Sequence, residues 1–363
     1  FDHCITLSGL IEEDVEVLQT EIEKFQLTLM IAMSGHEGTC REAEAICRAF
    51  LPQYSNDPLT SEWRCNKRST NDRIRHLQKK PQWSVSVAED LSKISSDNYP
   101  IVLKPEEGGA GSINVKICTN QEMAREYFQE ALQNNVIFGS RLSQTFAEKF
   151  ILGEEYLLDC ASYHGYHSVT AVQKYKKFSI KNITRYHTIT YVSRTTELFQ
   201  VLEKFAINVL NSVEMKYGLS HLEVILSEDG PVLVELNPRI SGSKGYGNLL
   251  TNINTNSNQV ASLLRLIQHG VDNIEERIIP SCIYYLQNNG YSYSRVNLDL
   301  LAQIKSIRNY SILVPHQAKK HLSSTLNETV ALILLANEST VQLQKDYNLL
   351  LTYERDGCLF LGD

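Results

Sequence analysis

The feature that most constrains the fold is a pair of alternating apolar runs within His221–Arg239. The two runs flank Ser227–Pro231, and an Asp-Gly step between alternating runs is typical of a β-hairpin. Taking these five residues as the loop predicts that Leu226 pairs with Val232. Because side chains alternate along a strand, one set of residues then points into a core: Leu222, Val224, Val234 and Leu236.

The same register places Glu223 opposite Glu235, with Asn237 and Arg239 farther along one face. Two facing carboxylates, with Cβ atoms about 5 Å apart, repel each other. The pair therefore needs a cation, or a raised pKa on one partner. Carboxylates with an amide oxygen suit Mg²⁺ or Mn²⁺ that carries phosphates, and Arg239 can bind a phosphate or carboxylate through two hydrogen bonds. A solvated face with scattered charges explains any one of these residues, whereas the whole set in register is typical of a functional site.

Composition narrows the class of protein. The chain has 363 residues, enough for two or three domains, and its net charge of -7 argues against nucleic acid as a partner. The eight cysteines are spread singly without a CxxC pair, which predicts reduced thiols in the cytoplasm and no zinc site. No apolar run approaches 18 residues and no signal peptide is recognised, so we expect no membrane span.

Near the N-terminus, the apolar run Thr28–Met33 precedes the turn Ser34–Thr39, and a helix is expected through Phe50. Strand, glycine-containing turn and helix predict an α/β unit, whose ligand edge lies at the carboxyl end of the strand. Glu37 would lie at that edge. It could serve as a ligand-binding carboxylate or as a favourable charge at a helix N-terminus.

A second glycine-rich turn, Glu106–Ser112, follows the expected strand Tyr99–Lys104. Such a turn can lay backbone N–H groups over phosphates, and Lys104 at the strand end could neutralise one. It lacks the spacing of a Walker loop, and a plain flexible hairpin is the other explanation.

The remaining chain alternates strands and helices. Strands are expected at Gln144–Leu152 and Glu155–Ala161, and a long helix at Thr195–Tyr217 leads to the hairpin. The tail predicts a strand at Thr329–Leu335 and a helix at Ser339–Leu351. The fold class is therefore α/β (α+β).

The order of these charged residues resembles a known family. Lys67 comes first, then Lys104 before the glycine turn, Glu148-Lys149-Phe150-Ile151, Gly153-x-Glu155, His221-x-Glu223 and Glu235-x-Asn237-x-Arg239. This order, over roughly residues 34–250, resembles ATP-grasp carboxylate–amine ligases. The tail resembles the C-terminal lobe of L-amino-acid ligases of the bacilysin and dapdiamide type.

The resemblance implies an ATP-grasp fold in four parts. These are a Rossmann-like pre-ATP-grasp domain at 1–80, a small lobe with the glycine-rich loop at 81–150, a large lobe with the metal site at 151–270, and a C-terminal α/β lobe at 271–363. Only about 33 residues precede the SGHEG turn, whereas the family has more strands there. The N-terminal domain is therefore expected to be incomplete.

The resemblance also implies a role for each site residue. Contacts to ATP are implied for Lys67, Lys104, Gly108, Gly109, Gly111, Ser112, Glu148, Lys149, Phe150, Ile151 and Glu155. Mg²⁺ or Mn²⁺ would be held by Glu223, Glu235 and Asn237. Arg239 would be catalytic, and substrate contacts are implied for Glu37, His187, Arg239, Ser241 and Gly242.

The implied reaction joins a small-molecule carboxylate to an amine. ATP would phosphorylate the carboxylate, and the amine would displace phosphate to give an amide. Two alternatives remain open: carboxylation or ligation of another acid, and a regulatory protein that binds ATP without turnover. Homodimers are common among such enzymes, and neither nucleic acid nor a membrane is an expected partner.

Overall fold

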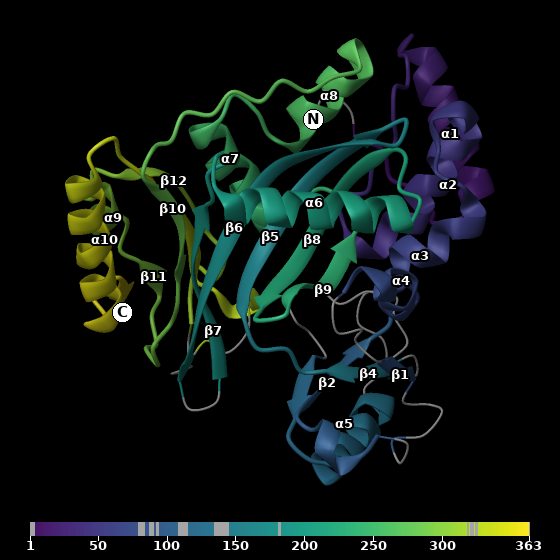
Figure 1. Ribbon diagram of the computed structural model, residues 1–363. Helices are drawn as coiled ribbons and strands as arrows, with labels where there is room; N and C mark the ends of the chain where they lie inside the picture. Colours follow the sequence, from purple (N-terminus) through teal and green to yellow (C-terminus); the bar gives the residue numbers. More distant parts are fainter. Residues whose placement is uncertain are drawn as a thin grey trace.

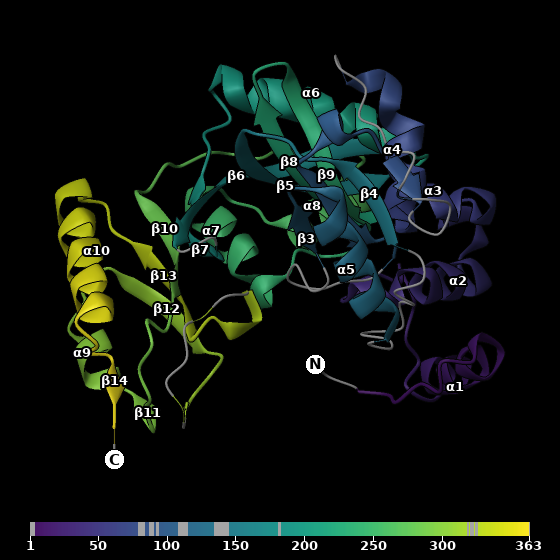
Figure 2. The same cartoon turned by 90° about the horizontal axis from the view of Figure 1, so that it is seen from below.

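The computed structural model describes residues 4–78, 84–86, 91, 94–107, 115–133, 145–180, 183–317, 319, 323 and 326–362. Figure 1 shows three regions: a group of N-terminal helices, a small sheet with one helix, and a large sheet with helices on its faces. Figure 2 shows the N-terminal helices and the C-terminal helices at opposite sides of the large sheet. In the described part of the chain, none of the helices combines the length and apolar character needed to cross a bilayer.

The N-terminal region is helical. It consists of α1 (Ile11–Lys24), α2 (Cys40–Phe50), α3 (Ser61–Cys65) and α4 (Lys67–Ile74), with short 3₁₀ turns between them. No strand precedes Ser84 among the described residues, so the strand predicted at Thr28–Met33 is wrong. An apolar run becomes a strand only where a neighbouring strand can pair with its backbone, and the described residues supply none there.

A four-stranded antiparallel sheet forms the small lobe. Its strands are β1 (Ser84–Ser86), β2 (Ile101–Pro105), β3 (Lys116–Cys118) and β4 (Thr145–Lys149), in the order β1-β4-β2-β3. The helix α5 (Gln121–Gln133) packs on it through Ala124, which lies in one cluster with Leu103 and Ala147. Lys104, on the alternate face of β2, is left free to reach toward the large sheet.

An eight-stranded sheet carries most of the remaining chain. Its strands are β5 (Glu154–Tyr163), β6 (Tyr166–Ile180), β7 (Ile183–Tyr191), β8 (Gly218–Ser227), β9 (Gly230–Asn237), β10 (Ser281–Leu286), β12 (Ile307–Ile312) and β13 (Ala331–Ala336). Their order is β12-β13-β10-β7-β6-β5-β8-β9. The sheet therefore continues across residue 270, and the four domain bounds stay a prediction. Two short strands, β11 (Arg295–Val296) and β14 (Phe360–Leu361), pair separately.

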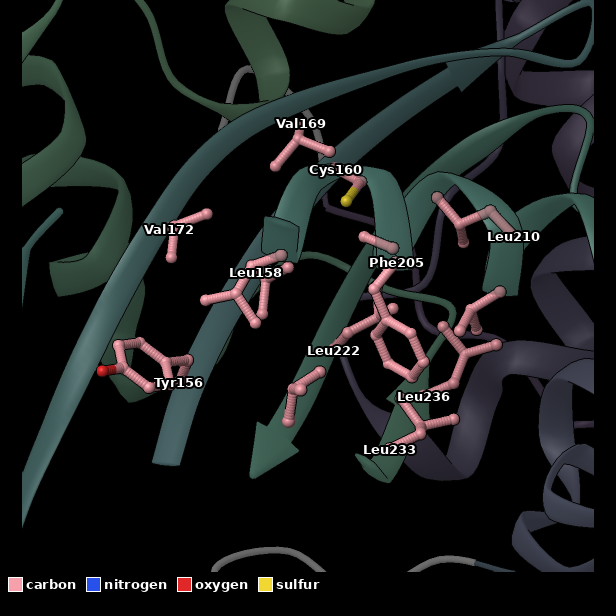
Figure 3. Packing of buried hydrophobic residues seen from close by; sticks show 14 of the residues in the cluster. Tyr156, Leu158, Cys160, Val169, Val172, Phe205, Leu210, Leu222, Leu233 and Leu236 are labelled. Atoms are coloured by element: carbon pink, nitrogen blue, oxygen red, sulfur yellow. The ribbon is translucent and has the colours of Figure 1, made fainter. Parts of the chain in front are cut away.

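The helix α6 (Glu197–Ser212) covers one face of β5, β6, β8 and β9. Its buried side chains include Phe205 and Leu210, which pack on Leu222, Leu233 and Leu236 of the hairpin (Figure 3). This core fixes which face of β8 and β9 is left for the charged residues, because side chains alternate along each strand.

Other helices cover the opposite face and the C-terminal strands. Tyr246 and Leu250 of α7 (Tyr246–Asn254) pack with Leu157 on the face opposite α6, and α8 (Gln259–His269) follows. The helices α9 (Leu298–Ala302) and α10 (Thr340–Arg355) cover β10 and β13. The expected helix and strand of the tail are thus present, as α10 and β13, and they share one hydrophobic cluster.

The predicted loop of the central hairpin is too long. Ser227 pairs with Gly230, which leaves a two-residue turn, and Leu226 lies opposite Pro231 rather than Val232. Gly230 has a φ of +119°, a conformation that glycine adopts without strain. The predicted pairing of Leu226 with Val232 is therefore wrong by one residue.

A β-bulge corrects the register farther along the hairpin. Val224 lies opposite Leu233, whereas Glu223 lies opposite Glu235, so Val234 is the extra residue. The carboxylate pair is therefore found where the sequence predicts it, although the predicted loop is wrong. Leu233 replaces Val234 in the core, and the half-buried Val234 presents its carbonyl oxygen toward the small lobe.

The core beneath α6 makes a testable prediction about stability. Leu202 is fully buried, whereas its neighbour Val201 is 43% exposed. We expect Leu202→Ala to lower the free energy of unfolding by about 2–4 kcal/mol, because it leaves a cavity. Val201→Ala should change it by less than about 0.5 kcal/mol. Urea denaturation followed by circular dichroism measures both, and equal losses would contradict the packing of α6.

Candidate active site

Two carboxylates face each other at the edge of the large sheet. Glu223 on β8 lies opposite Glu235 on β9. Burial and the negative charge of Glu235 raise the pKa of Glu223 to about 7. Burial also opposes ionisation of Glu235, but the charges of Lys67 and Lys104 outweigh it and lower the pKa of Glu235. The two lysines thus favour the ionised form of Glu235. The negative charge on Glu223 is balanced less completely, so its protonated form is favoured.

Lys67 and Asn237 border the ionised carboxylate. Lys67 begins α4, and its Nζ lies 2.9 Å from Glu235 Oε1. Burial lowers the pKa of Lys67, but the charge of Glu235 and its other acidic neighbours raises it overall. Asn237 is buried, and its amide nitrogen has no hydrogen-bond partner in the part of the chain that the structure describes. The side-chain N–H₂ of Asn237 can therefore donate to a ligand.

This set of side chains fits a hard divalent cation. Two carboxylates in register and the amide oxygen of Asn237 are the kind of oxygen ligands that Mg²⁺ prefers when phosphates supply the rest. Within the described ranges, no group of three or more His, Cys, Asp or Glu side chains is arranged to hold a metal by itself. A site with only two carboxylates suits an ion that arrives with a nucleotide rather than a structural zinc.

Lys104 ties the small lobe to the large sheet at this point. Its Nζ donates a 2.7 Å hydrogen bond to the carbonyl oxygen of Val234, the bulged residue. The same Nζ lies 2.6 Å from Glu148 Oε1 on β4. Burial raises the pKa of Glu148, although the charge of Lys104 opposes the shift. The bulge thus creates the acceptor that positions this lysine beside the carboxylate pair.

Glu155 on β5 is held by a lysine that sequence analysis did not single out. Lys177 Nζ lies 2.6 Å from both carboxylate oxygens of Glu155 and 4.6 Å from the centre of the Tyr186 ring. Burial lowers the pKa of Lys177, but its neighbours Tyr186, Glu155 and Glu223 raise it overall. The position of Lys177 depends on pairing between β6 and β5, which the sequence of β6 alone does not reveal.

Arg239 meets Glu37 from the N-terminal region. Arg239 Nη2 donates to Glu37 Oε1 in a close ion pair, and Nη1 donates to the carbonyl oxygen of Ile240 at 2.9 Å. The second oxygen, Glu37 Oε2, is buried without a hydrogen-bond partner among the described residues. Residues 202 positions apart are thus brought together, and one carboxylate oxygen is left for a cationic ligand.

Ser241 and Gly242 lie beside Arg239. The backbone N–H of Ser241 donates to Gln259 Oε1 at 2.9 Å, which fixes the start of the loop. A Cβ added at Gly242 would lie 3.7 Å from Arg239 Nη1. A pocket with about 250 Å³ of empty space opens nearby. Its lining residues are Glu37, Cys40, Cys65, Lys67, Glu235, Leu236, Asn237 and Pro238.

The remaining residues implied by the resemblance make none of the contacts given above among the described residues. Lys149 ends β4 with an exposed side chain, and Phe150 and Ile151 follow it half-buried. His187 Nε2 lies 3.2 Å from the hydroxyl of Tyr347 on α10, and burial lowers the pKa of His187 to about 4. The positions Gly108, Gly109, Gly111 and Ser112 lie outside the described residues.

A buried pair next to Glu223 was also missed. His221 Nδ1 lies 2.7 Å from Asp159 Oδ1, and His221 Nε2 lies 3.9 Å from Glu223 Oε1. In the sequence, His221 was recognised as part of the motif His221-x-Glu223. Asp159 could not be connected to it, because that requires the register between β5 and β8.

Comparison with known proteins identifies the domain. Residues 97–246 match the sequence profile of the ATP-grasp domain. Dapdiamide A synthase of Enterobacter agglomerans is 25% identical over 242 residues, which cover 63% of this chain and 54% of that protein. The chain thus spans about half the length of the curated relative it matches.

Solved structures show the same fold. An L-amino acid ligase from Bacillus licheniformis superposes with a TM-score of 0.74 and 16% identity, covering 96% of this chain and 86% of that one. A phosphoribosylglycinamide synthetase from Anaerococcus prevotii gives 0.61 and 12%, covering 96% of this chain and 86% of that one. The chain therefore contains an ATP-grasp domain, has the ATP-grasp fold and is distantly homologous to dapdiamide A synthase.

Proposed function

We propose that the protein is an ATP-dependent ligase that joins the carboxylate of an amino acid to an amine, with release of ADP and phosphate. The observation that carries the proposal is the Glu223–Glu235 pair in register, with Asn237 and Arg239 farther along β9. The names of two similar proteins, an L-amino acid ligase and dapdiamide A synthase, support an amino acid as the acid substrate.

In this proposal, the nucleotide phosphates lie against the carboxylate pair. Glu223, Glu235 and Asn237 would hold Mg²⁺ or Mn²⁺, which supplies positive charge to the phosphates when bound. Lys67 and Lys104 would exchange their present carboxylate partners for phosphate oxygens. The exchange replaces one ion pair by another, so neither lysine is left buried without a counter-charge.

Contacts to the rest of the nucleotide follow from the same placement. Glu155 would accept hydrogen bonds from the ribose hydroxyls, and Glu148 with Lys149, Phe150 and Ile151 would bind the adenine. The glycine-rich residues Gly108, Gly109, Gly111 and Ser112 would cover the phosphates. His187, which contacts Tyr347, remains a proposed substrate contact.

The chemistry would proceed in two steps. A carboxylate oxygen of the acid attacks the γ-phosphorus, the bond to the β-phosphate oxygen breaks, and ADP leaves. The amine nitrogen then attacks the acyl-phosphate carbon, the amine loses a proton, and phosphate leaves. The protein contributes by positioning both reactants and by placing Arg239 where negative charge develops on oxygen.

The substrate ammonium group would bind at Glu37. Its Oε2 is buried without a hydrogen-bond partner among the described residues, Glu37 lines the pocket, and Arg239 holds the other oxygen in place. Ser241 and Gly242 would line the same region, where the absence of a side chain on Gly242 permits close approach. We expect small-molecule substrates and a cytoplasmic reaction, in keeping with eight free cysteines.

One alternative has a specific observation behind it. N5-carboxyaminoimidazole ribonucleotide synthetases share the fold at TM-scores of 0.55–0.64 and 14–16% identity. Phosphate release that requires bicarbonate rather than an amino-acid pair would favour a carboxylase. ATP binding without ADP formation under any acid substrate would favour a regulatory protein.

Removing the guanidinium of Arg239 tests its catalytic role. We expect Arg239→Ala to lower the rate of amide formation about 100-fold or more, because a positively charged hydrogen-bond donor to the developing oxyanion is lost. The affinity for ADP should stay within about threefold, since the arginine lies beyond the proposed nucleotide contacts. Coupled ADP release and product mass spectrometry measure the rate.

A matched control is Arg277→Ala, which removes an arginine that is 73% exposed and pairs with Glu338. It should leave the rate unchanged. An Arg239→Ala enzyme that forms amide at the parent rate would show that another group stabilises the acyl intermediate.

The raised pKa of Glu223 predicts how pH affects stability. Between the ordinary value near 4.5 and the folded value near 7, the folded protein binds the extra proton. The free energy of unfolding of wild type, measured relative to that of Glu223→Gln, should therefore fall as pH rises through this window. The expected fall is roughly 2 kcal/mol between pH 5 and pH 8. Urea denaturation of both proteins at each pH measures the difference.

Magnesium should reverse this loss. At pH 8 and with ADP already present, added Mg²⁺ should raise the melting temperature of wild type further but not that of Glu223→Gln, because only the ionised pair binds the cation. A stability difference that is flat with pH, or an equal response of both proteins to Mg²⁺, would be inconsistent with a coupled carboxylate pair.

A further inference from the structure

Asp159 and His221 form a buried pair that the proposed mechanism does not use. They lie directly opposite each other on β5 and β8. Asp159 is 2% exposed and His221 is 7% exposed, and the distance between His221 Nδ1 and Asp159 Oδ1 is 2.7 Å. A carboxylate at this distance accepts the Nδ1–H and fixes both the tautomer and the plane of the ring.

Asp159 is itself held in place by its surroundings. A β-bulge leaves Thr170 as the extra residue on β6, and its hydroxyl donates a 3.0 Å hydrogen bond to the carbonyl oxygen of Asp159. Above the side chain lies Gly247 of α7, where an added Cβ would come within 3.6 Å of Asp159 Oδ2. The side-chain amide of Gln173 donates to the carbonyl oxygen of Gly247 at 2.8 Å and so keeps the helix close. The carboxylate that orients His221 therefore has little freedom to move.

The other ring nitrogen of His221 is directed at the carboxylate pair. His221 Nε2 lies 3.9 Å from Glu223 Oε1, and the two residues share one face of β8. Glu235, the cross-strand partner of Glu223 on β9, repels the same carboxylate. The attraction of a cationic or N–H edge of His221 offsets part of that repulsion and favours one orientation of the Glu223 carboxylate.

We infer that His221, oriented by Asp159, is a positioning residue that holds the Glu223 carboxylate in place for the divalent cation. The inference rests on the proposed function, because it takes Glu223 as a ligand of that cation. It extends the proposal to two residues that have no place in the ATP, metal or substrate contacts given above. Outer partners of this kind typically affect metal affinity by 10–100-fold when they are lost.

The plainer explanation is that the pair only joins β5 to β8. Two substitutions of His221 separate the two explanations. Asparagine places its amide near the position of Nδ1, so His221→Asn can keep the contact with Asp159 but loses the edge toward Glu223. Glutamine reaches the position of Nε2, so His221→Gln keeps the edge toward Glu223 but loses the contact with Asp159.

The measurement is the affinity for Mn²⁺, determined by electron paramagnetic resonance with and without ADP, together with the melting temperature of each metal-free protein. We expect His221→Asn to melt close to wild type and to bind Mn²⁺ at least tenfold more weakly. His221→Gln should bind Mn²⁺ within about threefold of wild type, even if it melts at a lower temperature. If His221→Asn binds Mn²⁺ as wild type does, the pair is only structural and the inference is overturned.

Glu223→Gln is the control that separates a failure of the metal site from a failure of the role given to His221. If it loses Mn²⁺ binding while His221→Asn does not, the metal site stands and only the role of His221 fails. If Glu223→Gln binds Mn²⁺ as wild type does, the proposed metal site fails and the inference fails with it.

Discussion

The repulsion between Glu223 and Glu235 is the constraint on which the rest of the site depends. Neighbouring strands hold the two carboxylates opposite each other, and the sheet cannot separate them without breaking its register. Counter-charges must therefore come from other parts of the chain. Lys67 comes from the N-terminal helices and Lys104 from the small sheet, and both lower the pKa of Glu235. The three regions of the fold meet where this charge has to be balanced.

The cations around the site are each paired with a carboxylate. Lys67 lies beside Glu235, Lys104 beside Glu148, Lys177 beside Glu155, and Arg239 beside Glu37. A buried charge without a partner is costly, so these pairs let the protein keep its lysines and arginine in place before a ligand arrives. A nucleotide with its metal would then rearrange existing pairs. The binding of a charged ligand is thereby reduced to an exchange of partners.

The local sequence pattern predicted which residues face each other in the hairpin, but it did not predict the details of strand pairing. The facing of Glu223 and Glu235 was predicted, although from a loop of the wrong length, and a bulge at Val234 restored the register. The position of a β-bulge cannot be predicted from the sequence of one strand, because it depends on how two strands pair. The run Thr28–Met33 has strand character but no partner among the described residues.

Residues whose neighbours lie on distant strands were the hardest to predict. Glu37 and Arg239 were each recognised, but their contact spans 202 positions. Lys177 and Asp159 were missed because their roles depend on how β5 pairs with β6 and β8. Periodicity tells which face a side chain occupies, whereas only the strand order tells what that face meets.

The central claim is that a carboxylate is activated as an acyl-phosphate at this site. The most direct test supplies ATP, Mg²⁺, an amine and an amino acid labelled with ¹⁸O in its carboxylate, and then examines the released phosphate by mass spectrometry. The account predicts one ¹⁸O atom in each phosphate released with amide, and ADP as the other product. Amide formed with unlabelled phosphate, or with AMP and pyrophosphate, would contradict it.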